Sequence, residues 1–573
     1  MILTNFSKVF KLISWKYKKN FFIIVFYSIL ISIFEFISIG TVPILLASLF
    51  NLKDNNTFEY IELIKSNLYI FELFNLKIIL IVVAIVFFLK FILAIIFFYK
   101  ETFFRKQITD FFRIILFKNF LELNYLDQIN FKKGDLLKRI LSDPSALASL
   151  LTNYIFIIRD FLTIFIIVFF MLIFNFKITL LSIVLISLLS IFFIFFYKKK
   201  LKIFGEQDQK LRSELNITTD NTFTSSKEIK VMGFEKKFVE LFSILTQKQS
   251  TFDFKSRFII SLPKIIFEIL IVLFILFILF FSKDLETESS ILLIQASVYI
   301  YAFSRLLPSA NSIVSNLSTN YYFFPSINFI EEGLKLNSNN KIFFGIKSKT
   351  VNNIKNFNFI IFKNISVYYK EKFLIKNLNF SIQRNKINLI KGPSGAGKST
   401  CLNVLSGLIK PSGGEILFDD ISVSLFANSL WKSQVGYLTQ SNYLFNSSIM
   451  ENITFKDNFN EIDKDKFHFS LQLSKLNKVF NIDKIKNFVV GINGNKVSGG
   501  QAQKILFARA IYFGQNILIL DEPTTALDDA SKEDMLLSLN ILSQKYKYTI
   551  IISTHENFKN LDCNLIELNH NIN

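Results

Sequence analysis

Six long apolar stretches restrict how this chain can fold more than any other feature of its sequence. They cover residues 21–50, 78–99, 154–175, 177–197, 259–282 and 289–315. A helix of about 20 apolar residues spans the hydrocarbon core of a bilayer, where only a backbone that satisfies its own hydrogen bonds is stable. We therefore expect residues 1–330 to form an all-α domain with six membrane-spanning helices.

Basic residues beside these stretches predict the orientation of the domain. Lys16, Lys18 and Lys19 precede the first stretch, and further lysines and arginines follow the second and fourth. Cytoplasmic loops carry an excess of such residues, so we expect a cytoplasmic N-terminus, no cleaved signal peptide, and helices that continue into the cytoplasm after the second and fourth spans. The external segment 51–77 fits either a short amphipathic helix on the membrane face or a solvated loop.

The rest of the chain has the composition of a soluble protein. Residues 331–355 are predicted to be a linker, and charged and apolar residues alternate over 356–573 as in an α/β domain. Both cysteines, Cys401 and Cys563, lie in this part, which indicates a reducing compartment without a disulfide framework. The formal net charge of +20 is by itself no sign of a nucleic-acid partner, and we expect none.

Residues 392–399 carry the clearest chemical motif. Their sequence, Gly-Pro-Ser-Gly-Ala-Gly-Lys-Ser, fills every fixed position of G-x-x-x-x-G-K-[ST]. In this pattern backbone N–H groups surround the phosphates of a nucleoside triphosphate, the lysine reaches the β- and γ-phosphates, and the serine ligates Mg²⁺. A buried strand over 386–390 and a helix over 399–408 are the expected context. The predicted nucleotide contacts are Gly392, Pro393, Ser394, Gly395, Ala396, Gly397, Lys398, Ser399 and Thr400.

Two carboxylates follow another apolar segment. Residues 517–520 read as a strand buried on both faces, and Asp521 and Glu522 come directly after it. At the end of such a strand Asp521 would reach the Mg²⁺ shell, while Glu522 would orient or deprotonate the water that attacks the γ-phosphate. The alternative is an ordinary core strand that runs into an acidic turn.

With Val497-Ser498-Gly499-Gly500-Gln501 the chain resembles the ATP-binding cassette (ABC) family, whose signature is Leu-Ser-Gly-Gly-Gln. Only Val497 departs from it, by a conservative apolar change. The resemblance implies that Ser498, Gly499, Gly500 and Gln501 face the γ-phosphate of a nucleotide at a helix N-terminus.

The resemblance assigns further residues by their order along the chain. It implies that Gln440 contacts Mg²⁺ and senses the transmembrane part, and that Asp528 belongs to a loop that meets the partner cassette. It also implies that His555 contacts the γ-phosphate, and that Tyr369, 23 residues before Gly392, stacks on adenine. Each of these side chains has a structural alternative as an ordinary core or surface residue.

In the ABC family the signature of one cassette closes over the phosphate loop of another. A chain with one cassette and six spans therefore resembles half a transporter, which implies a second chain, either identical or similar; we expect a homodimer. The implied fold is a six-helix transmembrane domain followed by an α/β P-loop nucleotide-binding domain. The implied activity is ATP hydrolysis coupled to transport, with ATP and Mg²⁺ as cofactors.

Three basic residues inside apolar stretches are candidate cargo contacts. Lys90, Lys264 and Arg305 are costly in a membrane unless they face a cavity or a partner. Their alternatives are snorkelling or pairing, and Glu268 lies one turn after Lys264. Basic residues that line an apolar passage would suit an amphipathic, anionic lipid.

Residues 304–311, Ser-Arg-Leu-Leu-Pro-Ser-Ala-Asn, also resemble the PglK-type flippases of lipid-linked oligosaccharides. This resemblance implies an ATP-driven flippase for a polyprenyl-pyrophosphate-linked oligosaccharide in the bacterial cytoplasmic (inner) membrane. Two alternatives remain: an exporter of peptides, drugs or another lipid, and a nucleotide-gated channel or regulatory membrane protein that does not depend on ATP turnover.

Overall fold

The computed structural model describes residues 2–49, 76–174, 176–282, 289–339 and 357–568, apart from positions 427, 442, 557 and 559–561. The chain divides into two compact units. The first comprises Met1–Leu121 and Phe131–Asn339, and the second comprises Glu122–Asn130 and Asn340–Asn573.

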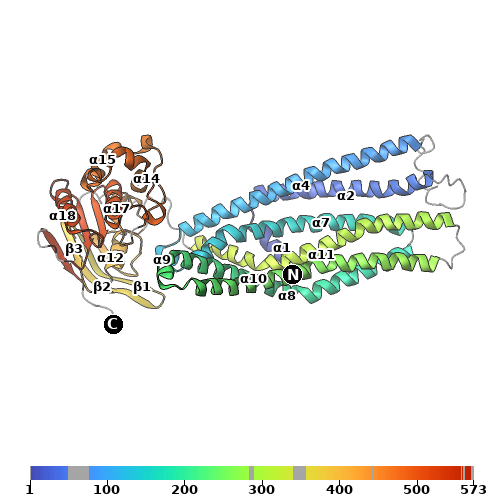
Figure 1. Cartoon of the computed structure of the whole chain (residues 1–573), viewed down its shortest axis with the longest axis horizontal. Coiled ribbons are helices and arrows are strands. Elements are labelled where there is room, and N and C mark those ends of the chain that lie inside the picture. Colours follow the sequence, from blue (N-terminus) through green and yellow to red (C-terminus); the bar gives the residue numbers. More distant parts are fainter. Residues whose placement is uncertain are drawn as a thin grey trace. The chain divides into compact units, whose positions relative to one another are not determined.

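The first unit is helical, and its long helices lie side by side (Figure 1). The long helices are α2 (Trp15–Leu49), α4 (Leu76–Leu121), α7 (Asp143–Phe174), α8 (Phe176–Thr224), α10 (Glu235–Ser282) and α11 (Ser289–Asn339). The short ones are α1 (Ile2–Lys11), α6 (Lys133–Leu137), the π-helical turn η2 (Lys138–Ser142) and α9 (Ser226–Met232). As expected from the sequence, α4 and α8 continue well past the apolar stretches at 78–99 and 177–197.

Four helical segments in the described part of the chain are long and apolar enough to cross a membrane. They are Trp15–Ser38, Leu80–Leu121, Lys133–Leu172 and Thr179–Thr224. A buried core that includes Met171, Leu201, Phe267 and Leu306 joins α7, α8, α10 and α11. At the contact between α8 and α11, a Cβ atom on Gly205 would lie 2.0 Å from the carbonyl oxygen of Tyr322, so only glycine allows this approach.

The second unit contains two sheets. A four-stranded antiparallel sheet has the order β2-β1-β4-β5, and a five-stranded parallel sheet has the order β6-β7-β8-β3-β9. The strands are β1 (Phe359–Tyr369), β2 (Lys372–Gln383), β3 (Ile387–Lys391), β4 (Gly413–Phe418), β5 (Ile421–Ser422), β6 (Val435–Leu438), β7 (Ile517–Asp521), β8 (Thr549–Ser553) and β9 (Cys563–Glu567).

Helices pack on both faces of the parallel sheet, with α12 (Lys398–Leu405) in one core and α17 (Gly499–Phe513) and α18 (Asp529–Gln544) in the other. The unit also contains α13 (Ser429–Lys432), α14 (Ile449–Thr454), α15 (Lys464–Leu473) and α16 (Ile482–Asn487), with 3-10 turns η3 (Phe459–Glu461), η4 (Leu476–Lys478) and η5 (Ile492–Gly494). The short helix α5 (Tyr125–Gln128) also belongs to this unit.

Successive residues of the parallel strands enter different cores. In β7, Leu518 and Leu520 pack in the core beneath α14 to α18, whereas Ile517 and Ile519 pack in the core that contains α12 and the antiparallel sheet. Because side chains alternate across a strand, a strand between two helical layers must be apolar at every position. This explains the unbroken apolar runs before the phosphate loop and before Asp521, and it fixes the strand ends that carry the site.

The sequence-based elements are found with small shifts. The strand predicted before the phosphate loop is β3, and the helix after it begins at Lys398 and ends at Leu405, earlier than the predicted end at 408. Helix α11 continues to Asn339, into the segment predicted as a linker. Residues 51–75 of the segment 51–77, predicted to be external, and the remainder of the predicted linker lie outside the described residues.

Candidate active site

The phosphate loop connects β3 to α12. It begins at Gly392, and Gly395 and Gly397 have φ angles of 82° and 87°, a left-handed conformation that side chains rarely adopt. Helix α12 begins at Lys398, so the backbone N–H groups of its first turn have no carbonyl partner within the helix. Ser399 and Thr400 occupy this turn. The segment can therefore surround an anion.

Lys398 lies at the centre of this loop. Its side chain is buried, and its ammonium group donates hydrogen bonds to the carbonyl oxygens of Gly392 (2.9 Å) and Pro393 (3.0 Å). The His555 Nε2 atom lies 3.1 Å from the same nitrogen. Burial lowers the pKa of Lys398, while the carboxylates of Glu522 and Asp521 act in the opposite direction.

The Glu522 carboxylate lies between Gln440 and His555. Gln440 Nε2 donates to Glu522 Oε2 at 3.1 Å, and His555 Nε2 lies 3.4 Å from Glu522 Oε1. The backbone of Glu522 has a φ of 49°, an unusual value for a non-glycine residue. It follows β7 directly, and its N–H donates to the carbonyl oxygen of Ser553 (2.9 Å). The turn away from the strand thus places one carboxylate beside Gln440 and His555, which follow β6 and β8.

Asp521 is held differently from its neighbour. It is the last residue of β7, is buried, and accepts a hydrogen bond from the hydroxyl of Ser553, its register partner on β8. Ser399, Asp521 and Gln440 offer a hydroxyl, a carboxylate and an amide oxygen. This is the hard oxygen donor set that Mg²⁺ prefers, completed in such sites by phosphate and water. The residues present fit that ion.

The signature residues form the N-terminus of α17. Ser498 is the N-cap: its hydroxyl accepts from the Gln501 N–H (3.2 Å), and the Gln501 side chain accepts from the Ser498 N–H (3.0 Å). This reciprocal capping box gives Ser498 and Gln501 a structural role within the chain, and the Ser498 hydroxyl keeps its proton for another acceptor.

Gly499 and Gly500 have no equivalent structural explanation. Neither has a positive φ, and added Cβ atoms would approach the nearest neighbours in Ala526 and Leu527 only to 3.6–3.8 Å. These are ordinary contacts, so the folded chain itself has room for a side chain at both positions. The glycines instead leave the N–H groups of a helix N-terminus accessible from outside.

Asp528 ends the loop that precedes α18. It stands at the N-cap of α18, and a hydrogen bond from Ser531 is the main factor that lowers its pKa. A Cβ atom added to Gly499 would lie 3.8 Å from the Ala526 side chain, so this loop and the signature adjoin within one chain.

Tyr369 is tied by its hydroxyl to the segment 122–130. It donates to the Asp127 carboxylate at 3.2 Å and accepts from Asn130 Nδ2 at 2.6 Å. Burial and the Asp127 carboxylate raise the pKa of Tyr369. The aromatic residue predicted to stack on adenine is therefore attached to α5 and its flanks.

All three basic candidates for cargo contact have acidic partners. Lys90 contacts Glu35, and Arg305 Nε lies 3.2 Å from the same carboxylate. Lys264 lies 3.9 Å from Glu268, with both side chains largely exposed. The pairing alternative is thus observed in the structure for each of them.

Comparison with known proteins decides the family. Residues 21–308, just over half of the 573-residue chain, match the model of the ABC transporter transmembrane region, and residues 375–525 match that of the ABC transporter. The chain belongs to the ABC transporter family. It also matches the fold of a bacterial Atm1-family ABC exporter with a TM-score of 0.75 over 95% of this chain and 94% of that one, at 17% identity. The predicted fold class, a helical transmembrane domain followed by an ABC nucleotide-binding domain, is confirmed.

Curated relatives of this ABC transporter match about a third of its length. The zinc import ATP-binding protein ZnuC of Rickettsia conorii is 32% identical over 35% of this chain and 77% of its own length. The ATP-dependent lipid A-core flippase of Blochmanniella floridana is 35% identical over 35% of each chain. The chain spans 53% of the spermidine/putrescine import ATP-binding protein PotA of Clostridium acetobutylicum, at 33% identity over 34% of this chain.

The structure adds residues that the motifs of the transporter did not reveal. Ser553 donates a hydrogen bond to Asp521. In the sequence, the only sign of this role was a serine at the end of an apolar strand. Arg509, on the signature helix α17, donates to the carbonyl oxygen of Asn452 at 2.6 Å and to its side chain at 3.1 Å, and burial lowers the pKa of Arg509 to about 10. These bonds fix α17 against α14.

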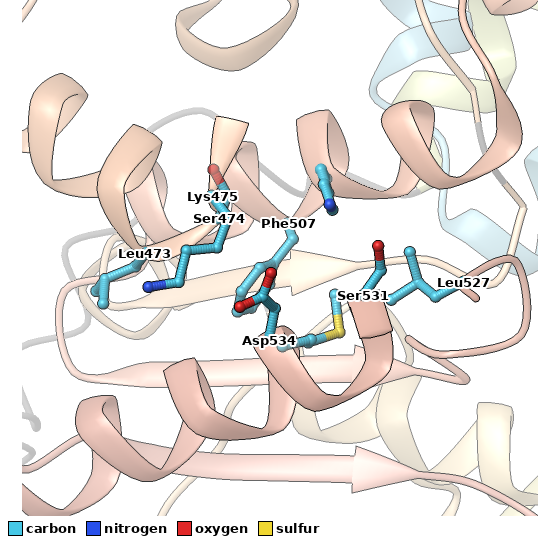
Figure 2. A pocket seen from close by; sticks show the side chains of 9 residues that line it. Leu473, Ser474, Lys475, Phe507, Leu527, Ser531 and Asp534 are labelled. Atoms are coloured by element: carbon cyan, nitrogen blue, oxygen red, sulfur yellow. The ribbon is translucent and has the colours of Figure 1, made fainter. Parts of the chain in front are cut away.

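Figure 2 shows a small hollow in the same unit. Residues of α15, α17 and α18 and the loops beside them line it: Leu473, Ser474, Lys475, Lys504, Phe507, Leu527, Ser531, Asp534 and Met535. It contains no residue of the phosphate loop, so it is not the predicted nucleotide site.

Proposed function

We propose that this chain is one half of an ATP-driven exporter-type transporter that acts as a flippase for a polyprenyl-pyrophosphate-linked oligosaccharide. The observation that supports ATP hydrolysis is that Gln440 and His555 both contact the Glu522 carboxylate, while Lys398 of the phosphate loop contacts His555. Its setting would be the bacterial cytoplasmic membrane, with the nucleotide-binding domain in the cytoplasm.

In this proposal Lys398 and the N–H groups of α12 bind the phosphates of ATP. Glu522 accepts a proton from the water whose oxygen attacks the γ-phosphorus, and the bond to the β-phosphate oxygen breaks as ADP leaves. Gln440 and His555 orient the Glu522 carboxylate and the water. Mg²⁺, held by Ser399, Asp521 and Gln440, would supply charge neutralisation at the phosphates.

A second copy of the chain would complete each site. The N-terminus of α17 offers anion-binding N–H groups, and neither packing nor backbone conformation of the single chain requires Gly499 or Gly500. An open helix N-terminus suits the γ-phosphate of a nucleotide held by another chain. A symmetric pair then contains two such composite sites.

Two kinds of observation support a lipid cargo. Basic side chains lie within the helical membrane domain at Lys90 and Arg305, and two relatives are named ATP-dependent lipid A-core flippases. Another relative is named a multidrug resistance ABC transporter, so an exporter of other amphipathic compounds is the competing function.

Reconstitution in liposomes tests the cargo directly. With a fluorescent pyrophosphate-linked glycan lipid in one leaflet, we expect ATP to make the probe inaccessible to a quencher on that side. If the probe becomes inaccessible without ATP, or stays accessible after ATP is added, the flippase proposal is contradicted. ATPase activity that is stimulated by peptides or drugs instead would support the exporter.

We expect a triple variant to flip the probe at least about tenfold more slowly, because charge-assisted contacts to phosphate are lost. Its substitutions are Lys90→Gln, Lys264→Gln and Arg305→Gln. Basal ATP hydrolysis is expected to change less than about threefold. Both rates should be measured in the same proteoliposomes. A matched control replaces three exposed lysines of α10, Lys236, Lys248 and Lys255, with glutamine. Equal losses of flipping and hydrolysis would indicate misfolding and contradict the proposed contacts.

Ser553→Ala is expected to raise the Mg²⁺ concentration needed for half-maximal ATP hydrolysis about 10- to 100-fold, the usual effect of losing the hydrogen-bond partner of a metal ligand. The reason is that Asp521 loses the hydroxyl that orients it. Ser543→Ala is the control, since Ser543 is also buried but donates to the carbonyl oxygen of Asn385. An unchanged Mg²⁺ dependence would contradict the assignment of Asp521.

A further inference from the structure

A buried carboxylate on α2 joins three helices of the membrane domain. Glu35 contacts the Lys90 ammonium on α4 with one oxygen, while its other oxygen lies 3.2 Å from Arg305 Nε on α11. The Glu35 side chain is 8% exposed, against 15% for Lys90 and 43% for Arg305. The three charges form a cluster from here on called the Glu35 cluster.

The Glu35 cluster has more positive than negative charge. Two cations face one carboxylate, and a buried charge in a membrane domain is stable only when it is compensated. Among the described residues, the buried Lys90 ammonium has no hydrogen-bond acceptor besides its ion-pair partner, and Arg305 meets the same carboxylate through Nε. Because a lysine has three N–H donors and an arginine has five, the cluster retains unused donors.

Two aromatic rings face these cations and compensate part of their charge. The Phe87 ring lies 5.6 Å from the Lys90 ammonium, and the Tyr301 ring lies 5.7 Å from the Arg305 guanidinium. The Tyr301 hydroxyl is buried and has no hydrogen-bond partner among the described residues. Donors for an additional anionic oxygen are thus concentrated around one carboxylate.

We propose that Glu35 is an internal counter-ion that competes with the phosphate group of the cargo for Lys90 and Arg305. This inference rests on the proposed flippase function and concerns the same two basic residues. The carboxylate stabilises the two cations when no cargo phosphate is near them, and a phosphate group that takes up the unused donors competes with it for both cations. The competition weakens cargo binding, which allows release in the opposite leaflet.

The test uses the full-length dimer in nanodiscs and a fluorescent polyprenyl pyrophosphate without glycan. Glu35→Gln is expected to bind this probe about tenfold more tightly than the unmodified protein, since one competing charge is removed, and to flip it more slowly because release is impaired. An uncharged polyprenol probe should show no such difference. Glu35→Asp, which keeps the charge, should remain within about threefold of the unmodified protein.

Asp160→Asn is the matched control. Asp160 is another buried carboxylate of the membrane domain, but it pairs with Arg159 at 2.7 Å. If loss of any buried carboxylate loosens the helices and thereby changes affinity, both variants will behave alike, and the proposal is overturned. Thermal unfolding and elution as a dimer establish that the compared proteins are folded.

The outcomes separate this inference from the proposed cargo. The counter-ion role is supported if Glu35→Gln binds the probe more tightly and Asp160→Asn does not, even if the unmodified protein binds too weakly to measure. Measurable binding by the unmodified protein with no gain in Glu35→Gln overturns the counter-ion role and leaves the cargo proposal standing. Absence of pyrophosphate binding in every variant overturns both.

Discussion

Replacing Glu522 with glutamine is expected to lower the rate of ATP hydrolysis about 100- to 10,000-fold, the usual contribution of a general base, while ATP still binds. The amide is nearly isosteric with the carboxylate and can remain beside Gln440 and His555, but it cannot accept a proton from water. Phosphate release measures the first effect, and binding of a fluorescent ATP analogue measures the second.

Glu556→Gln is the matched control for this variant. Glu556 follows His555 directly, yet its carboxylate accepts from Thr524 at 3.1 Å and from Lys532 at 2.9 Å rather than from residues of the phosphate loop. We expect its hydrolysis rate to stay within about threefold of the unmodified protein, since the contacts of this carboxylate lie outside the phosphate loop. If Glu522→Gln keeps its hydrolysis rate, Glu522 is not the base. If transport continues undiminished without hydrolysis, the chain is a nucleotide-gated channel or regulator instead of a pump.

Adding ATP is expected to raise the yield of a cysteine cross-link between two chains at least about tenfold when Ser394 and Ser498 are both replaced with cysteine. Ser394 lies in the phosphate loop, and Ser498 caps the signature helix. A nucleotide bound between them brings the two segments of different chains together, and a disulfide requires Cβ atoms about 3.5–4.5 Å apart. The Glu522→Gln background prevents hydrolysis from reopening the site.

The two single cysteine variants are the controls for this cross-link, because each supplies only one side of the contact. Cys401 is fully buried, and burial raises the pKa of its thiol, so it is a poor nucleophile; Cys563 is replaced with serine in all samples. Electrophoresis without reductant separates dimers from single chains. A disulfide within one chain, or a dimer that forms equally without ATP, would contradict a composite site.

The arrangement of the residues predicted for the nucleotide site follows from rules of local chain geometry. The spacing of Gly392 to Ser399 specifies a loop that is followed directly by a helix. The apolar runs of β3 and β7 specify strands whose ends lie at one edge of a parallel sheet. Resemblance to the ABC family then selected Gln440 and His555, and the structure places both beside Glu522.

The partners of these residues were not predictable from the motifs. Ser553 supports Asp521 only because β7 and β8 are neighbours in register, and Tyr369 meets Asp127 although 242 positions separate them. The left-handed backbone at Glu522 likewise results from the junction of β7 with its neighbour rather than from the residue type.

The membrane domain shows most clearly which features the sequence predicts and which only the packing of the chain decides. The length and apolarity of its stretches determined that this chain forms long helices, because a bilayer leaves the backbone no other way to satisfy its hydrogen bonds. Lys90 and Arg305 stood out in the sequence as charges in an apolar setting, but Glu35 did not stand out as their partner. Only the packing of α2, α4 and α11 decided that pairing, since charge compensation in a medium of low dielectric constant depends on distances in space and not on separation along the chain.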